Sequence, residues 1–149
     1  MILGVATSLS LPPFNYFLIN FIIFPLFFLF LIKKMNNHKN KKLFFFYGWL
    51  YGFGYFLSNI YWISISLSFD QSFKFLIPIA IILIPSFLAL FYGLMTLFFI
   101  IFKTKKNVKL FLIFSLIYGS LEFLRGIVLT GFPWNLIAYS FLEKLEIIS

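Results

Sequence analysis

Long apolar runs separated by short polar segments recur from one end of the chain to the other. Residues 14 to 32, 75 to 102 and about 108 to 125 each form a run long enough to cross a bilayer core, which needs roughly 20 helical residues. Residues 43 to 68 form another run, long enough to tilt in the membrane. The runs do not alternate with period two, so a barrel of strands is excluded. The pattern predicts an all-α, polytopic helical membrane domain.

Residues 1 to 11 are apolar too, but as a helix they would reach only about 17 Å. They lack the basic segment that begins a signal peptide. We expect them to be the second half of a spanning helix whose beginning is missing. Residues 12 to 15, "PPFN", predict a turn, because Pro13 disfavours the helical conformation of Pro12. Together the runs predict about five spanning segments.

Two features of the runs predict how the helices pack and bend. Gly48 and Gly52 lie four residues apart on one helical face, as in the small-residue surfaces that allow close packing of membrane helices. Pro85 lies inside the run from 75 to 102, where it removes a backbone donor and predicts a kink.

The basic residues are concentrated in two short loops. Of the 12 lysines and arginines, nine lie in the lysine-rich segments 33 to 42 and 103 to 109. Such an excess is typical of the cytoplasmic loops of membrane proteins. We therefore predict that both loops and the N-terminus face the cytoplasm, and that "PPFN", residues 68 to 74 and the segment after Arg125 face the opposite side. The net charge of +8 then reflects orientation, and we predict no nucleic-acid partner.

The remaining composition limits the chemistry. Residues are 62% hydrophobic and 11% charged, with a mean hydropathy of +1.04, which excludes an ordinary soluble domain. Without cysteine, this sequence holds no disulfide, thiolate nucleophile or cysteine metal site. The single histidine, His38, lies in the first lysine-rich loop and is expected to be solvated. Four acidic residues are too few and too scattered for a carboxylate metal cluster, so we expect no metal and no cofactor.

Glu122 and Arg125 are the charged pair at the end of the last long run. Their i, i+3 spacing makes them neighbours on one helical face. One interpretation is that the pair solvates itself near the membrane surface and holds the helix there. The other is that Arg125 presents its fixed fork of donors to an anionic lipid phosphate, while Glu122 orients the guanidinium or meets an ammonium group. The residues alone leave both interpretations open.

Beyond Arg125 the sequence predicts a broken or re-entrant stretch. The motif "GFPWN", residues 131 to 135, indicates backbone that leaves the helix at membrane depth, which is tolerated where protein buries it or where it lines a cavity. Trp134 and Tyr139 are interfacial aromatic residues on one interpretation. On the other, they and Pro133 form part of the wall of a lipid-binding cavity.

Three stretches in order resemble the membrane domain of bacterial apolipoprotein N-acyltransferases. They are "LPPFNYFLI" from residue 11, "GWLYGFGYFLSNIYWISIS" from residue 48 and "EFLRGIVLTGFPWNLIAYS" from residue 122. The last is the most diagnostic, because E-x-L-R-G, T-G-F-P-W and Y-S follow one another without a gap. The resemblance runs from about Leu3 to Ser140. It departs at Ala138, where the family typically has glycine, and in a shortened first helix.

This resemblance implies an activity and its partners. Such enzymes move an acyl chain from a membrane phospholipid to the α-amine of the lipid-modified N-terminal cysteine of a lipoprotein, at the outer face of the bacterial inner membrane. By the same resemblance, Arg125 matches an arginine thought to meet lipid headgroups, and Trp134 lies near the mouth of the active site. We expect Arg125, Glu122, Trp134, Tyr139 and Pro133 to be the substrate-binding residues.

The resemblance also implies what this sequence does not carry. The family's catalytic Glu, Lys and Cys belong to a nitrilase-like domain further along the chain, where a thiolate takes the acyl group. We therefore expect residues 1 to 149 to be an incomplete N-terminal transmembrane domain with no catalytic residue, inactive by itself. A non-enzymatic membrane protein, such as a transporter fragment or a lipid-binding subunit, is the alternative.

Overall fold

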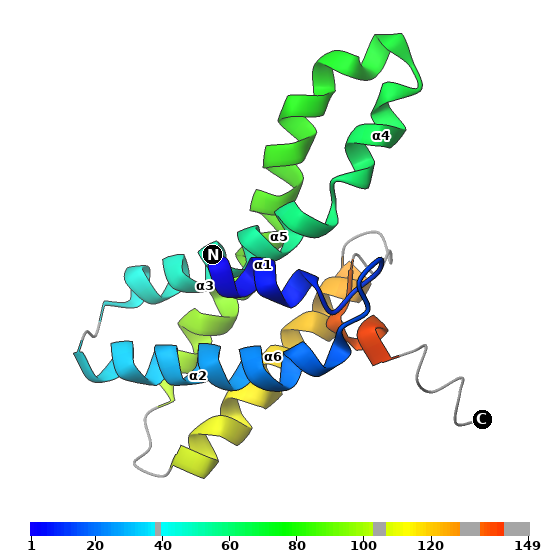
Figure 1. The fold of residues 1–149 in the computed structure, drawn as a ribbon. Coiled ribbons are helices and arrows are strands. Elements are labelled where there is room, and N and C mark those ends of the chain that lie inside the picture. Colours follow the sequence, from blue (N-terminus) through cyan, green and yellow to red (C-terminus); the bar gives the residue numbers. More distant parts are fainter. Residues whose placement is uncertain (38–39, 103–106, 129–134, 142–149) are drawn as a thin grey trace.

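The computed structural model describes residues 1–37, 40–102, 107–128 and 135–141, which form helices and turns and contain no strand. The all-α prediction is therefore confirmed for these residues (Figure 1). The elements in chain order are α1 (Ile2–Ser8), η1 (Phe17–Ile19), α2 (Asn20–Asn37), α3 (Lys41–Asn59), α4 (Trp62–Ser68), η2 (Gln71–Leu76), α5 (Ile77–Ile101), α6 (Asn107–Val128) and η3 (Ile137–Phe141).

Three described helical segments are long and apolar enough to cross a membrane: Phe17–Asn36, Lys74–Ile101 and Asn107–Val128. They correspond to α2, α5 and α6, and they overlap three of the predicted runs. Only 11% of the most apolar stretch of α6 is buried inside the protein, so most of its side chains face the surroundings. An apolar surface of this kind is suited to hydrocarbon. The other two expected spans, residues 1–11 and 43–68, stay predictions.

The apolar run from 43 to 68 is divided between two helices. α3 ends at Asn59 and α4 begins at Trp62. The side-chain amide of Asn59 donates a hydrogen bond to the carbonyl of Tyr55 at 3.0 Å. Asparagine side chains bond to nearby backbone in this way and are disfavoured inside helices, which agrees with a helix end at Asn59 although the run remains apolar.

α3 and α5 pack closely where the sequence predicted a small-residue face, and that prediction is confirmed. A Cβ atom on Gly48 would collide with the backbone carbonyl of Tyr92, and one on Gly52 would lie 2.8 Å from the Tyr92 ring. The hydroxyl of Thr96 on α5 donates to the carbonyl of Phe44 on α3 at 2.7 Å. The two glycines therefore let the helix backbones approach each other.

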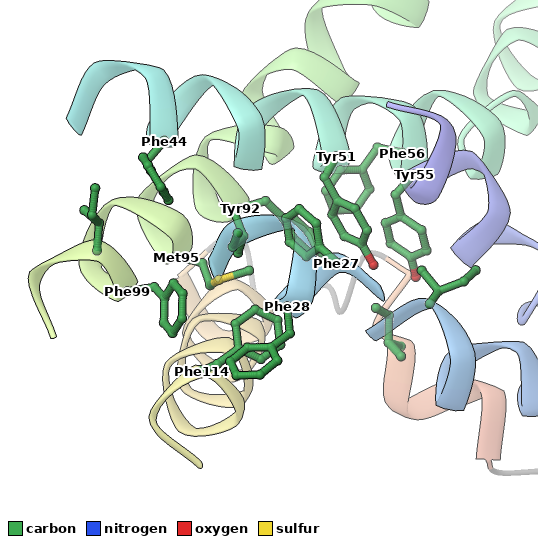
Figure 2. Close-up of a cluster of buried hydrophobic side chains, with 14 of the residues drawn as sticks. Phe27, Phe28, Phe44, Tyr51, Tyr55, Phe56, Tyr92, Met95, Phe99 and Phe114 are labelled. Carbon is green, nitrogen blue, oxygen red and sulfur yellow. The ribbon is translucent and has the colours of Figure 1, made fainter. Parts of the chain in front are cut away.

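An aromatic core joins α2, α3, α5 and α6 (Figure 2). The ring of Phe27 from α2 stacks on Tyr51 from α3, with the centroids 4.2 Å apart. Phe114 from α6 meets Phe99 from α5 edge to face at 5.5 Å. Such rings bury large apolar areas and prefer these offset and edge-to-face arrangements. The core therefore fixes α6 against helices that are distant in the sequence.

α4, η2 and the first half of α5 form an arm that extends away from the other helices (Figure 1). α5 continues through Pro85, and the kink predicted there stays a prediction. The indole of Trp49 on α3 donates to the carbonyl of Ser86 at 3.0 Å, just beyond the proline. This contact joins α3 to α5 close to where the arm begins.

Candidate functional site

Glu122 and Arg125 form an ion pair on the last turns of α6. The Nη2 atom of Arg125 lies 2.9 Å from Oε1 of Glu122, which confirms that the i, i+3 spacing makes them neighbours. The Arg125 side chain is 1% exposed and that of Glu122 is 14% exposed. An unpaired charge in such surroundings would carry a large desolvation penalty. Mutual pairing therefore stabilises both charges in the interior.

Two tyrosines extend this pair into a chain of hydrogen bonds. The hydroxyl of Tyr92 on α5 donates to Oε1 of Glu122 at 2.8 Å. The hydroxyl of Tyr118 on α6 lies 3.1 Å from that of Tyr92. Because the single hydroxyl hydrogen of Tyr92 is directed at the carboxylate, Tyr118 donates to Tyr92. Glu122 thus links α6 to α5 through a polar path inside an apolar core.

The ion pair and a third tyrosine also hold the backbone that follows α6. The N–H of Ile137 donates to Oε2 of Glu122 at 3.1 Å. The carbonyl of Asn135 accepts from the hydroxyl of Tyr55 at 2.7 Å and from Nη2 of Arg125 at 3.4 Å. Asn135 itself has φ 40°, a left-handed conformation that asparagine tolerates better than most residues. Segment 135–141 is therefore held against α6 by side chains of α3 and α6.

An aromatic ring covers the guanidinium. The Cζ atom of Arg125 lies 4.9 Å from the centre of the Phe56 ring, and Phe56 is fully buried. A cation over an aromatic face is attracted by the negative charge density of the ring. We call Tyr55, Tyr92, Tyr118, Glu122 and Arg125 the polar cluster.

Beside the polar cluster lies a cavity of about 550 Å³ between α2 and α6, with η3 at one end. Figure 1 shows η3 beside the end of α6 and the beginning of α2. The cavity wall is mainly aromatic and includes Phe24, Phe114 and Phe141. Its polar side chains include Asn20 and Glu122, so the cavity and the polar cluster share a residue. The volume falls in the range of roughly 300–1,000 Å³ that is typical of small-molecule sites.

The other predicted site residues are placed differently. Tyr139 lies in η3 and is 37% exposed. Ala138 and Phe141, which flank Tyr139 in the same segment, are among the residues that line the cavity. Pro133 and Trp134 lie outside the described residues. Within the part of the chain that the structure describes, no three His, Asp or Glu side chains come together in a way that could hold a metal ion.

Sequence reasoning identified the ion pair but missed its partners. Tyr55 lies on α3 and Tyr92 on α5, each 30 or more residues from Glu122 along the chain. Tyr118 lies on α6, the helix that carries Glu122. One signal pointed to them, because a tyrosine buried in an apolar helix usually finds a partner for its hydroxyl. That signal does not say which partner is chosen. Asn20, at the beginning of α2, was not singled out either.

The fold defines the class of protein: an all-α protein whose described residues include three helices able to cross a membrane, and a buried ion pair next to an apolar cavity. The family is shown by its sequence. Residues 3–149 match the family described as apolipoprotein N-acyltransferase N-terminal domain, and the chain belongs to that family. This membership agrees with the resemblance carried by the three motifs.

Curated relatives carry the same family name. The chain is 37% identical to an apolipoprotein N-acyltransferase of Rhizobium leguminosarum bv. trifolii over 91% of its own length and 26% of the relative's. It is 38% identical to that of Rickettsia prowazekii over 95% of its length and 27% of the relative's. The Rhodopseudomonas palustris protein is 36% identical, over 97% and 27%. The chain thus spans about a quarter of these relatives. No solved structure matches it significantly.

Proposed function

We propose that this chain is the membrane part of an apolipoprotein N-acyltransferase, which moves an acyl chain from a phospholipid to the α-amine of a lipoprotein's N-terminal diacylglyceryl-cysteine. The observation that carries the proposal is the family match over residues 3–149, which includes the gapless motif around Glu122 and Arg125. Acyltransferase relatives at 37% and 38% identity support the same family-level activity.

The proposed role of the chain is to hold lipid, and the catalytic groups belong to another part of the enzyme. A sequence without cysteine offers no thiolate to take the acyl group, so these 149 residues alone should give no transfer. The 550 Å³ apolar cavity beside Glu122 supports a lipid-holding role. We propose Arg125, Glu122, Pro133, Trp134 and Tyr139 as the residues that hold or border the substrate.

Arg125 has two proposed roles that differ in what they require. In direct binding, the guanidinium would meet a lipid phosphate, and this stays a prediction. In positioning, Arg125 would fix segment 135–141 beside the cavity. The ion pair with Glu122, the contact with the Asn135 carbonyl and the 1% exposure of Arg125 support the positioning role. The two roles are compatible if a headgroup approaches only when segment 135–141 moves.

We also propose that the protein lies in the bacterial inner membrane with its N-terminus and its two lysine-rich loops in the cytoplasm. The clustering of nine basic residues in loops 33–42 and 103–109 supports this orientation. It would place the end of α6, with Glu122 and Arg125, toward the outer face. The family resemblance assigns acyl transfer to that face.

A chimaeric enzyme tests the proposed function. Residues 3–149 of this chain replace the matching part of the Rickettsia prowazekii relative, and acyl transfer to a diacylated lipopeptide is measured in membranes. We expect transfer by the chimaera and none by the 149-residue chain alone. A chimaera that inserts normally but transfers no acyl chain would contradict the proposal. The control chimaera carries an unrelated helical membrane domain in the same place and should be inactive.

The same chimaera separates the two roles of Arg125. Under direct binding, Arg125→Ala should slow formation of the acyl-enzyme from phospholipid, while insertion and the folding of segment 135–141 survive. Under positioning, Arg125→Ala should also expose segment 135–141 to protease. Loss of insertion with normal kinetics in the inserted fraction would support the simpler role of holding the helix in place.

A further inference from the structure

We propose that the cavity between α2 and α6 binds one acyl chain of a membrane phospholipid, and that Asn20 accepts a hydrogen bond from an N–H or O–H in the lipid's polar part. This inference rests on the proposed lipid-holding role and adds which part of the lipid lies in the cavity and which side chain meets its polar part. The site is defined by side chains of α2, α6 and η3 that the structure describes.

The shape of the cavity fits a chain lying along the helices. Its lining on α6 runs from Phe111 to Phe123, about 18 Å at helical rise. The hydrocarbon of one leaflet is about 15 Å deep, half of the roughly 30 Å core. A lipid tail of the leaflet on the side of Asn20 would therefore fill the groove from its polar end to the middle of the membrane.

Gly119 shows that the groove is open along α6. A Cβ atom built on Gly119 would meet no atom within 4 Å, although the residue lines the cavity. The side chains around it, such as Phe24 and Phe114, are apolar, so water would gain little there. Because α2 and α6 are both candidate spans, the apolar occupant that surrounds them is the lipid tail.

Asn20 supplies the polar end of the site. It is 2% exposed and lines the cavity. Its Nδ2 atom donates to the hydroxyl of Ser140 at 3.1 Å, and that hydroxyl donates to the carbonyl of Ile137 at 2.7 Å. Since the only hydrogen of the Ser140 hydroxyl is used, its oxygen can only accept, which fixes the orientation of the Asn20 amide.

This orientation leaves one acceptor without a partner. Oδ1 of Asn20 is buried and accepts no hydrogen bond from the described residues. A buried amide oxygen without a donor is costly, so a ligand that supplies an N–H or O–H there gains a hydrogen bond that the protein does not provide. A phospholipid that places one acyl chain in the cavity and carries an N–H or O–H donor on its headgroup satisfies both halves of the site.

Photolabelling in vesicles tests the site. The 149-residue chain is reconstituted in phosphatidylethanolamine and phosphatidylglycerol vesicles that contain a trace of phospholipid with a diazirine at the end of one acyl chain. We expect label on the groove residues around Phe111 and Phe114, above the level on Leu83 and Phe87 of α5. Those two side chains are exposed and report the ordinary surrounding lipid. Equal labelling of both sets would overturn the proposal, as would no label in the groove.

Matched variants separate the two halves of the proposal. Gly119→Phe fills the groove and should abolish the excess label at Phe111, whereas Leu116→Phe, on a 71% exposed position of the same helix, should not. Unchanged label in Gly119→Phe overturns the acyl-chain half. The label on Leu83 reports whether each variant is folded and inserted.

The polar half is read from the headgroup of the photolipid. An ethanolamine headgroup carries N–H donors and a choline headgroup carries none, so the wild-type groove should favour the former by about fivefold, the effect of one hydrogen bond. Asn20→Leu should remove this preference, while Ser140→Thr, which keeps the hydroxyl that orients the Asn20 amide, should retain it. A preference that survives Asn20→Leu overturns this half. Since binding and not transfer is measured, a failure of this test is distinguishable from a failure of the proposed acyl transfer.

Discussion

Glu122 accepts a hydrogen bond from the backbone N–H of Ile137 at 3.1 Å, although 15 residues separate them. The same carboxylate accepts from Arg125 and Tyr92 through its other oxygen. One buried acidic group therefore ties the backbone after α6 to α6 itself and to α5. We therefore expect the charge of Glu122 to stabilise the folded protein whether or not a ligand is bound.

Glu122→Gln should destabilise the protein strongly, because it leaves the buried guanidinium of Arg125 without its counter-charge. Removing one partner of a buried ion pair typically costs about 3–5 kcal/mol. The measurement is thermal or denaturant unfolding in detergent micelles. Lys109→Gln removes an exposed charge from the same helix and should change stability little.

The double variant Glu122→Gln, Arg125→Met sharpens this test. It removes both charges, so it should be more stable than Glu122→Gln alone, since the uncompensated cation is gone. If the double variant loses as much stability as Glu122→Gln and Arg125→Met lose in sum, the two charges are not coupled and the ion pair is not what stabilises this region.

Tyr55→Phe should loosen segment 135–141 specifically. The hydroxyl of Tyr55 donates to the Asn135 carbonyl at 2.7 Å, and losing one such bond costs about 1 kcal/mol. We expect faster hydrogen exchange of the amides in η3, with little change in α2. Tyr61→Phe, at a 54% exposed position, is the matched control and should leave exchange in η3 unchanged. Uniformly faster exchange in every helix would mean that the hydroxyl supports the whole core instead.

Gly48→Ala and Gly119→Ala should differ in their effect on the stability of the protein. At Gly48 the new methyl group would collide with the Tyr92 carbonyl and separate α3 from α5, which should cost about 1–3 kcal/mol. At Gly119 there is open space, so alanine should be neutral or stabilising by up to about 1 kcal/mol through its better helix propensity. Unfolding of both variants in one detergent gives the comparison. Equal destabilisation would contradict the close approach of α3 and α5.

The predicted orientation can be tested directly because the chain contains no cysteine. Single cysteines replace Lys41, in the first lysine-rich loop (33–42), and Gln71, in η2; both positions are exposed. A maleimide that cannot cross membranes should label Gln71→Cys in intact cells and Lys41→Cys only after permeabilisation. The reverse pattern would overturn the topology and, with it, the placement of Arg125 toward the outer face.

The sequence by itself determined that the protein is helical, that at least three of its runs suit a membrane, and that Glu122 and Arg125 are neighbours. These features follow from local rules: the length of an apolar run, the 3.6-residue turn and the close packing that glycines permit. The motif from residue 122 onward was also enough to indicate the family. Local patterns could not show that α3 ends at Asn59, because the apolar run continues through that residue.

Only the tertiary structure decided what surrounds the charged pair. Tyr55 and Phe56 lie on α3 and Tyr92 lies on α5, and their separation from the pair along the chain does not predict that they meet it or the backbone beside it. The tertiary structure also leaves Oδ1 of Asn20 without a hydrogen-bond donor among the described residues, because Ser140 binds the other end of the same amide. The physical reason is that hydrogen bonds in an apolar interior are satisfied by whichever groups the packing brings within reach, and packing depends on the whole set of helices at once.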